Sequence, residues 1–139
     1  MSARAASHAF LEHTSETRLL VRAGSFAELL AEAARALAEL EGRGVAPGPA
    51  GEGEAIEVHA PDGAALLVEW LNELVFRAER GAGVPCDVEV LEAGETVLRA
   101  RVRFARLPEA PALVKAATLH GLRLEPKDGM LEAEVTLDV

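Results

Sequence analysis

Alternation of apolar and polar residues predicts β-strands at several places along the chain. Residues 17–23 alternate, with Arg18 and Arg22 on the polar side, which is the period-two pattern of a half-buried strand. The same pattern recurs in five further segments, 55–60, 87–92, 96–105, 114–125 and 130–139. Most of the predicted strands therefore lie in the second half of the chain.

Two other segments place apolar residues three and four positions apart, which predicts amphipathic helices. The first begins after Ser25, whose spacing from Glu28 is that of a capping box, and it ends near Gly42. The second follows a Pro-Asp-Gly turn at 61–63 and carries the strongest apolar stripe, made of Leu66, Leu67, Trp70, Leu71, Leu74, Val75 and Ala78. We expect this second helix to anchor the core, since burying each large apolar side chain contributes about 1.5–3 kcal/mol.

This order of elements predicts an α+β fold in a single domain. We expect a largely antiparallel sheet with the two amphipathic helices on one face. Residues 1–12 are expected to form a flexible N-terminus, and residues 13–139 the domain. The Gly- and Pro-rich stretch 42–53 is expected to be an exposed, mobile loop. It lacks the Gly-Lys-Ser/Thr ending of a phosphate-binding loop.

Composition and charge narrow the functional classes. The chain has 139 residues, of which half are hydrophobic and 27% charged, as in one globular domain. The net charge of −9 argues against a surface that grips nucleic-acid phosphates, so we expect a partner to hold any RNA. Cys86 is the single cysteine and is expected to be a small apolar filler. With no leader-like or 18-residue apolar stretch, we expect a soluble cytoplasmic protein without membrane contact.

Polar residues near the two ends of the chain offer candidate chemistry. His8, His13 and Glu16 could provide metal ligands or an acid–base pair, and a plain polar loop is the alternative interpretation. Asp138 and the terminal carboxylate of Val139 are neighbouring hard oxygen donors that suit Ca²⁺ or Mg²⁺. Strand pairing could bring Glu16 to them as a third acid. The alternative for the last residues is a fraying terminus.

A histidine within the predicted strand 114–125 is a further candidate functional residue. Alternation places Thr118 and His120 on one face with the apolar residues Val114, Ala116 and Leu122, and places Lys115 on the opposite face. A histidine among apolar neighbours is either a ligand or a hydrogen-bonded structural residue. Both interpretations stay open on the sequence alone.

An arginine stripe on the predicted hairpin is interpreted as a solvent-exposed face. Arg99, Arg101 and Arg103 alternate along one strand, and the facing strand offers Asp87 and Glu89 as partners. The sequence also has no nucleophile elbow, dinucleotide fingerprint or kinase motif set. Nothing in the residues themselves demands an enzyme.

Four motifs, in order along the chain, resemble the archease family. Residues 13–16, His-Thr-Ser-Glu, are similar to its His-Thr-Ala-Asp signature, and residues 66–76 to its central helix. Residues 114–122 resemble its Val-Lys-Ala-Val-Thr-Tyr-His segment, and residues 135–139 its hydrophobic-Leu-Asp-Ile/Val terminus. Two positions depart from the family pattern: the fourth residue of the first motif is Glu rather than Asp, and Leu119 replaces Tyr.

The resemblance implies an accessory protein rather than an enzyme. Archeases assist the RtcB-type RNA ligase of tRNA splicing and RNA repair by promoting guanylylation of the ligase and its repeated turnover. The family binds a divalent cation, usually described as calcium, and the matching positions here are Glu16, Asp138 and Val139. Docking on a basic RNA enzyme would give the acidic charge a role.

The resemblance also implies residues that serve the partner. The family's functionally important lysine falls on Lys115, and the matched motifs include His13, Thr118 and His120, which we expect to take part in ligase contact or activation. A chaperone-like or general protein-interaction module without a metal role remains the alternative function. A metal-dependent hydrolase fits less well, because the carboxylates come without an evident nucleophile or base.

Overall fold

The computed structural model describes residues 5–12, 16–42, 47–108 and 114–139. These residues form seven strands and two helices. In chain order they are β1 (Ser7–Glu12), β2 (Glu16–Ala23), α1 (Phe26–Gly42), β3 (Ala50–His59), α2 (Gly63–Glu79), β4 (Val84–Ala93), β5 (Val97–Ala105), β6 (Ala116–Lys127) and β7 (Met130–Asp138).

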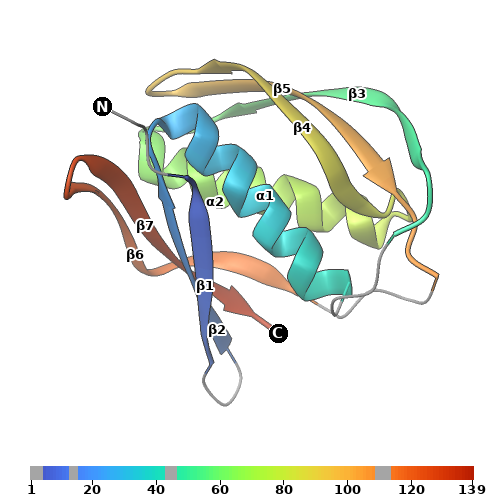
Figure 1. Ribbon diagram of the computed structural model, residues 1–139, viewed down its shortest axis with the longest axis horizontal. Coiled ribbons are helices and arrows are strands. Elements are labelled where there is room, and N and C mark those ends of the chain that lie inside the picture. The colour runs from blue at the N-terminus through green and yellow to red at the C-terminus, as the bar shows by residue number, and fades with distance from the viewer. Residues whose placement is uncertain (1–4, 13–15, 43–46, 109–113) are drawn as a thin grey trace.

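The strands are divided between two antiparallel sheets. One has the order β1-β2-β7-β6, and the other has the order β3-β5-β4. Figure 1 shows the four-stranded sheet at the lower left, the three-stranded sheet at the upper right, and both helices between them. The α+β class with antiparallel strands and two helices is confirmed. The helices, expected on one face of a single sheet, are instead covered by a sheet on each of two sides.

The composition of α1 explains the two-sided packing. Its buried positions include Ala33, Ala34, Ala36 and Leu37, which do not fall on one narrow stripe. Small alanine side chains let the helix approach a neighbour closely on more than one side, and α1 contacts both β2 and β4. A search for one apolar stripe therefore underestimates how much of this helix is buried.

The core is centred on α2. Trp70 is fully buried, and its indole Nε1–H donates a hydrogen bond to the backbone oxygen of Leu30 on α1 at 2.9 Å. Alternate residues of β2, including Leu19 and Val21, are buried in the same cluster. The expectation that the second helix anchors the core is confirmed.

Both helices begin with a side-chain cap. The Ser25 hydroxyl accepts the backbone N–H of Glu28 at 3.2 Å, as the capping spacing predicts. Asp62 caps α2, because its Oδ1 accepts the backbone N–H of Ala65 at 2.8 Å. Within the described ranges, neither helix is long and apolar enough to cross a membrane.

Three local expectations differ from the structure. Residues 7–12, expected to belong to a flexible N-terminus, form β1. The strand expected over 55–60 begins at Ala50, so residues 50–53 of the expected loop are strand residues, supported by Arg103 Nε–H donating to the Gly51 carbonyl at 2.9 Å. Cys86 is exposed rather than a core filler, because the apolar face of β4 is not regular there.

An ionic contact joins the edge strand β1 to α1. The two ring nitrogens of His8 lie 2.6 Å from carboxylate oxygens of Glu32 and Glu39. Burial of the ring lowers the pKa of His8, but hydrogen bonds to the two carboxylates outweigh burial and raise it above 6.5. While Glu32 is ionised, the contact therefore contributes fully to stability below about pH 6.5, and its contribution is lost as the pH rises through the raised pKa of His8.

Candidate functional site

Two carboxylates lie opposite one another at the end of the two inner strands of the larger sheet. Glu16 at the start of β2 pairs with Asp138 at the end of β7. Their neighbours Thr17 and Leu137 are buried, so Glu16 and Asp138 point away from the helices, because successive side chains alternate between the faces of a strand. Opposite residues of an antiparallel pair have Cβ atoms about 4.5–5.5 Å apart. The sheet thus brings together acids from opposite ends of the chain.

Lys115 reaches the same end of the sheet from the other side of β7. Ala116, the first residue of β6, pairs with Asp138, and the backbone N–H of Lys115 donates to the Asp138 carbonyl at 2.8 Å. The Lys115 side chain is exposed. Val139 follows β7 and is 42% exposed. Lys115, Asp138, Val139 and Glu16 therefore occupy one corner of the molecule.

Thr118 lies in the regular part of β6 next to this corner, whereas His120 lies in an irregular part of the strand. Thr118 pairs with Thr136, but the β6–β7 register breaks directly after Thr118, where Gly121 has a φ of +67°. His120 is exposed, with its backbone carbonyl accepting from the Thr136 hydroxyl at 3.0 Å. Regular alternation therefore does not extend from Thr118 to His120, because an irregular segment interrupts the pairing with β7.

His13 lies outside the described residues, so its expected role stays a prediction. The roles expected for Glu16, Asp138, Val139, Lys115, Thr118 and His120 also stay predictions, although their placement is now known. No group of three or more His, Cys, Asp and Glu side chains in the described ranges is arranged to hold a metal ion. Two carboxylates are nevertheless hard oxygen donors of the kind that Ca²⁺ accepts, so the donor chemistry fits a weak site completed by a further oxygen ligand.

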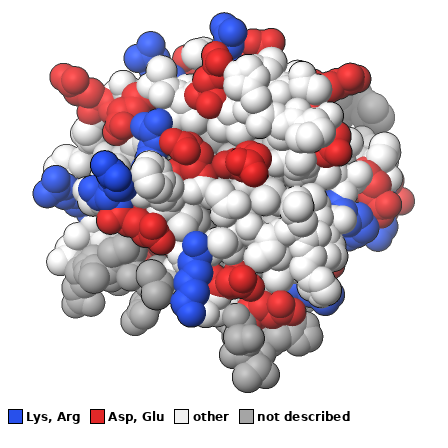
Figure 2. All heavy atoms as spheres, turned by 180° about the vertical axis from the view of Figure 1, so that it is seen from behind, with Lys and Arg blue, Asp and Glu red and all other residues white. Residues whose placement is uncertain are grey.

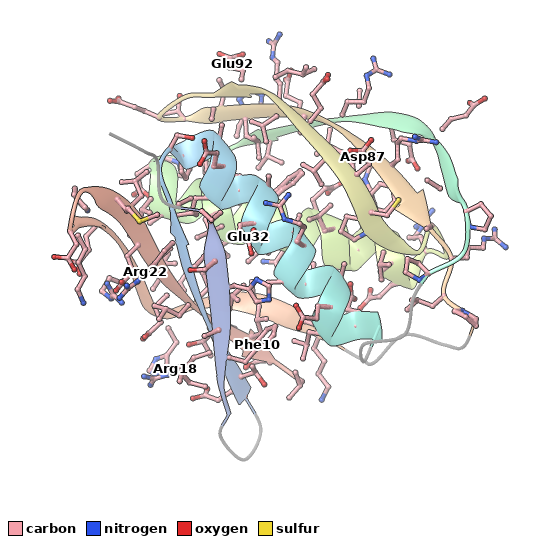
Figure 3. All side chains as sticks on the ribbon, viewed as in Figure 1. Phe10, Arg18, Arg22, Glu32, Asp87 and Glu92 are labelled. Carbon is pink, nitrogen blue, oxygen red and sulfur yellow. The ribbon has the colours of Figure 1, made fainter. Side chains whose placement is uncertain are left out.

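Charged residues on the rest of this sheet face are paired with one another. The Glu132 side chain is only 3% exposed, and its oxygens lie 2.5 Å from Arg22 Nε and 2.8 Å from an Arg123 nitrogen. The hydrogen bond from Arg123 holds the pKa of Glu132 below its usual range. Arg18 lies 3.6 Å from Glu134, and Figure 3 shows Arg18 and Arg22 projecting on the side of β2 away from α1.

This ion-pair network distinguishes the corner from the remainder of the face. Among the salt bridges formed by the described residues, none involves Glu16 or Asp138. The sequence pattern does not predict the network by itself, although arginines alternate at 18 and 22 and glutamates at 132 and 134 in two predicted strands. What was missing was the pairing of β2 with β7.

The arginine stripe on the other sheet lies opposite acidic residues, as expected. Arg103 and Arg101 face Asp87 and Glu89 across the β4–β5 hairpin, and Arg99 lies 3.0 Å from a carboxylate oxygen of Glu57 on β3. Figure 2 shows the molecule from behind, with acidic and basic side chains interspersed and no large continuous basic patch on that face.

The fold and this corner define a small α+β protein with two sheets around two helices and with two half-buried carboxylates at one end of the larger sheet. The model of the Archease protein family matches residues 8–139. Protein archease of Methanopyrus kandleri is 35% identical over 136 residues, which cover 93% of this chain and 96% of that protein. The chain belongs to the archease family.

Solved structures show the same fold. The solution structure of protein 1598 from Methanobacterium thermoautotrophicum is similar with a TM-score of 0.74 and 24% identity, over 95% of this chain and 98% of that one. The crystal structure of an archease from Thermotoga maritima, described as a possible chaperone, is similar with a TM-score of 0.62 and 23% identity, over 93% and 94% of the two chains. At these identities the likeness supports the architecture alone.

Proposed function

We propose that this protein is an accessory factor for an RNA ligase of the RtcB type, rather than an enzyme itself. It would promote guanylylation of the ligase and its multiple turnover in tRNA splicing and RNA repair. Membership of the archease family supports this proposal. The observation that carries it is the corner where Glu16 lies opposite Asp138, without ion pairs among the described residues, next to the exposed Lys115.

A divalent cation, most simply Ca²⁺, belongs to the proposal. Glu16 and Asp138 would hold it through their side chains, and Val139 would hold it through its main-chain carboxylate. When bound, the cation would supply positive charge and open coordination positions for oxygen ligands. Glu16 is longer than the family aspartate by one methylene, about 1.5 Å, and Ca²⁺ tolerates such irregular coordination better than Mg²⁺ does.

The partner-facing residues in this proposal surround the carboxylates. Lys115 would contact the ligase directly, and His13, Thr118 and His120 would contribute to the same contact. The net charge of −9 would speed encounter with a basic ligase surface, since complementary charge raises association rates. We propose a cytoplasmic setting, with RNA held by the ligase and with no direct nucleic-acid or membrane binding by this chain.

Reconstitution with an RtcB-type ligase tests the function. The wild-type protein is expected to raise the rate of ligase guanylylation and to convert single-turnover joining into multiple-turnover joining. Lys115→Ala is expected to lose most of this effect, whereas Lys127→Ala, an equally simple change near the far end of β6, is expected to keep it. The readouts are the labelled ligase–nucleotide adduct and the number of RNA products per ligase.

A failure of the wild-type protein to change either readout would contradict the proposal. If the same preparation suppressed aggregation of an unfolding client equally well with and without the Asp138 carboxylate, the chaperone-like alternative would be favoured. Equal loss of activation in Lys115→Ala and Lys127→Ala would remove the assignment of Lys115, because general charge rather than position would then explain the effect.

Calcium binding is expected to depend on the paired carboxylates. Asp138→Asn removes one negative ligand without a large change in size, and we expect it to weaken Ca²⁺ binding in calorimetry at least tenfold. One alanine added after Val139 should weaken binding too, because it displaces the main-chain carboxylate. Asp87→Asn, on the other sheet, is the matched control. Equal affinity in wild type and Asp138→Asn would refute the site.

A further inference from the structure

The side-chain amide of Asn72 on α2 forms two hydrogen bonds to a single residue of β6. Asn72 Nδ2–H donates to the Ala117 carbonyl at 3.1 Å, and the Ala117 backbone N–H donates to Asn72 Oδ1 at 2.7 Å. β6 is an edge strand of its sheet, so these two backbone groups point to a side where no strand follows. The Asn72 amide thus takes the place of a neighbouring strand at Ala117.

The pairing of β6 with β7 explains why such a contact is needed. Next to the turn, Arg123 pairs with Glu134, whereas beyond the irregular segment Thr118 pairs with Thr136. β6 therefore advances five residues while β7 advances two. The turn between the strands sets the first part of the register, but it cannot set the second part, because the extra residues of β6 could be accommodated at several positions.

The second part of the register is the part that builds the candidate site. It places Ala116 opposite Asp138 and brings the Lys115 N–H to the Asp138 carbonyl at 2.8 Å. A shift of one residue would turn every side chain of this segment to the opposite face. Lys115 would then leave its place beside Asp138, and the buried Ala117 would be replaced in the core by a neighbour.

Asn72 is well placed to prevent that shift. Leu71, directly before Asn72, and Leu74, two residues after it, are fully buried in the core. The helix α2 therefore provides a fixed reference outside the sheet. An amide that both donates to and accepts from one residue excludes a shift by one residue, because the adjacent residues of a strand turn their N–H and C=O groups to the opposite side. The Lys115–Asp138 and Thr136–His120 bonds lie within the sheet and move with it.

We propose that Asn72 is a positioning residue that fixes the register of residues 115–118 against β7 and so holds Lys115 beside Asp138. The expected effect on binding rests on the proposed cation and ligase-binding corner. The expected effect on the β6–β7 register does not depend on that proposal. Asn72 itself touches neither a ligand nor the two carboxylates in this assignment. Its effect on binding is transmitted through Ala117.

Two variants separate the two hydrogen bonds. Asn72→Leu keeps the size of the side chain and removes both bonds, and Asn72→Asp keeps the acceptor for the Ala117 N–H but loses the donor to its carbonyl. We expect Asn72→Leu to lose the cross-strand nuclear Overhauser contacts between Ala116 and Asp138 and to lower hydrogen-exchange protection of the Ala117 amide at least tenfold. For Asn72→Asp we expect contacts and hydrogen-exchange protection between those of the wild type and those of Asn72→Leu. This variant provides the test if Asn72→Leu does not fold.

Calcium affinity gives the functional readout. We expect a loss of about 10-fold or more in Asn72→Leu, the size found for residues that orient a metal ligand without touching the metal. Val88→Ala, on β4 in the other sheet, is the matched control: it should lower the melting temperature without changing the Ala116–Asp138 contacts or the affinity. This comparison separates positioning from a general loss of stability.

The outcomes distinguish this inference from the proposed function. An unchanged Ala116–Asp138 register in Asn72→Leu, with Ca²⁺ affinity within twofold of wild type, would overturn the inference. If the wild-type protein bound no Ca²⁺, the proposed cation site would fall, and the register contacts in the Asn72 variants would still decide whether Asn72 positions β6. Loss of register in both Asn72→Leu and Val88→Ala would also count against a specific role.

Discussion

Replacing Glu41 by glutamine is expected to stabilise the protein at pH 8 and above by up to about 5 kcal/mol. Glu41 lies in the last turn of α1 and is only 3% exposed. Its Oε1 has no hydrogen-bond partner among the described residues. Burial raises the pKa of its carboxyl group from 4.5 to about 8, and the nearby negative charge of Glu79 on α2 adds to the shift.

The sign of the pH dependence follows from the proton that Glu41 holds. Between pH 4.5 and about 8 the folded protein keeps this proton while the unfolded chain releases it, so the stability contributed by the neutral carboxyl group is greatest below pH 4.5 and falls as the pH rises to 8. Each unit of pKa difference corresponds to 1.36 kcal/mol, which gives an upper limit of about 5 kcal/mol. Glutamine has nearly the same shape and no proton to lose.

Chemical denaturation at pH 5 and pH 8.5 measures this effect. The difference in unfolding free energy between Glu41→Gln and wild type is expected to grow clearly between the two pH values. Glu28→Gln, at an exposed position near the start of the same helix, serves as the control, and its difference should stay within about 0.5 kcal/mol at both pH values. A constant difference for Glu41→Gln would show that its carboxyl group does not titrate across this range.

Replacing Trp70 by alanine is expected to cost about 3–5 kcal/mol of unfolding free energy, the range for deleting a large buried aromatic side chain. Trp70 is fully buried, and its Nε1–H bonds to the Leu30 carbonyl of α1 at 2.9 Å. The change opens a cavity between the two helices and removes their hydrogen bond. Since domains are stable by about 5–15 kcal/mol, this variant should lose roughly a fifth or more of its stability.

Trp70→Phe separates ring volume from hydrogen bonding. It keeps an aromatic ring in the core and removes the indole N–H, so we expect a cost of about 1–2 kcal/mol, the scale of one hydrogen bond and a smaller ring. Urea denaturation of both variants is the measurement. Equal losses in Trp70→Phe and Trp70→Ala would show that the bond to Leu30, and not the volume of the ring, dominates the contribution.

The sequence predicted most elements because their signals are local. The alternation at 17–23, the cap at Ser25 and the stripe around Trp70 each report burial within a few residues, and each corresponds to an observed element. β1 was missed because residues 7–12 form a strand only beside β2, where His8 also contacts α1. The alternation expected to continue from Thr118 to His120 is interrupted where the β6 register breaks.

For the candidate site, the sequence supplied the residues and the fold supplied their arrangement. Amino-acid types and motif order determined the family, the acidic charge and the candidate residues Glu16, Lys115 and Asp138. Only the tertiary structure decided that Glu16 faces Asp138, that the neighbouring charges pair with one another, and that Asn72 reaches Ala117. The physical reason is that periodicity reports which side of an element is buried, whereas partners distant in sequence are chosen by strand pairing and layer packing.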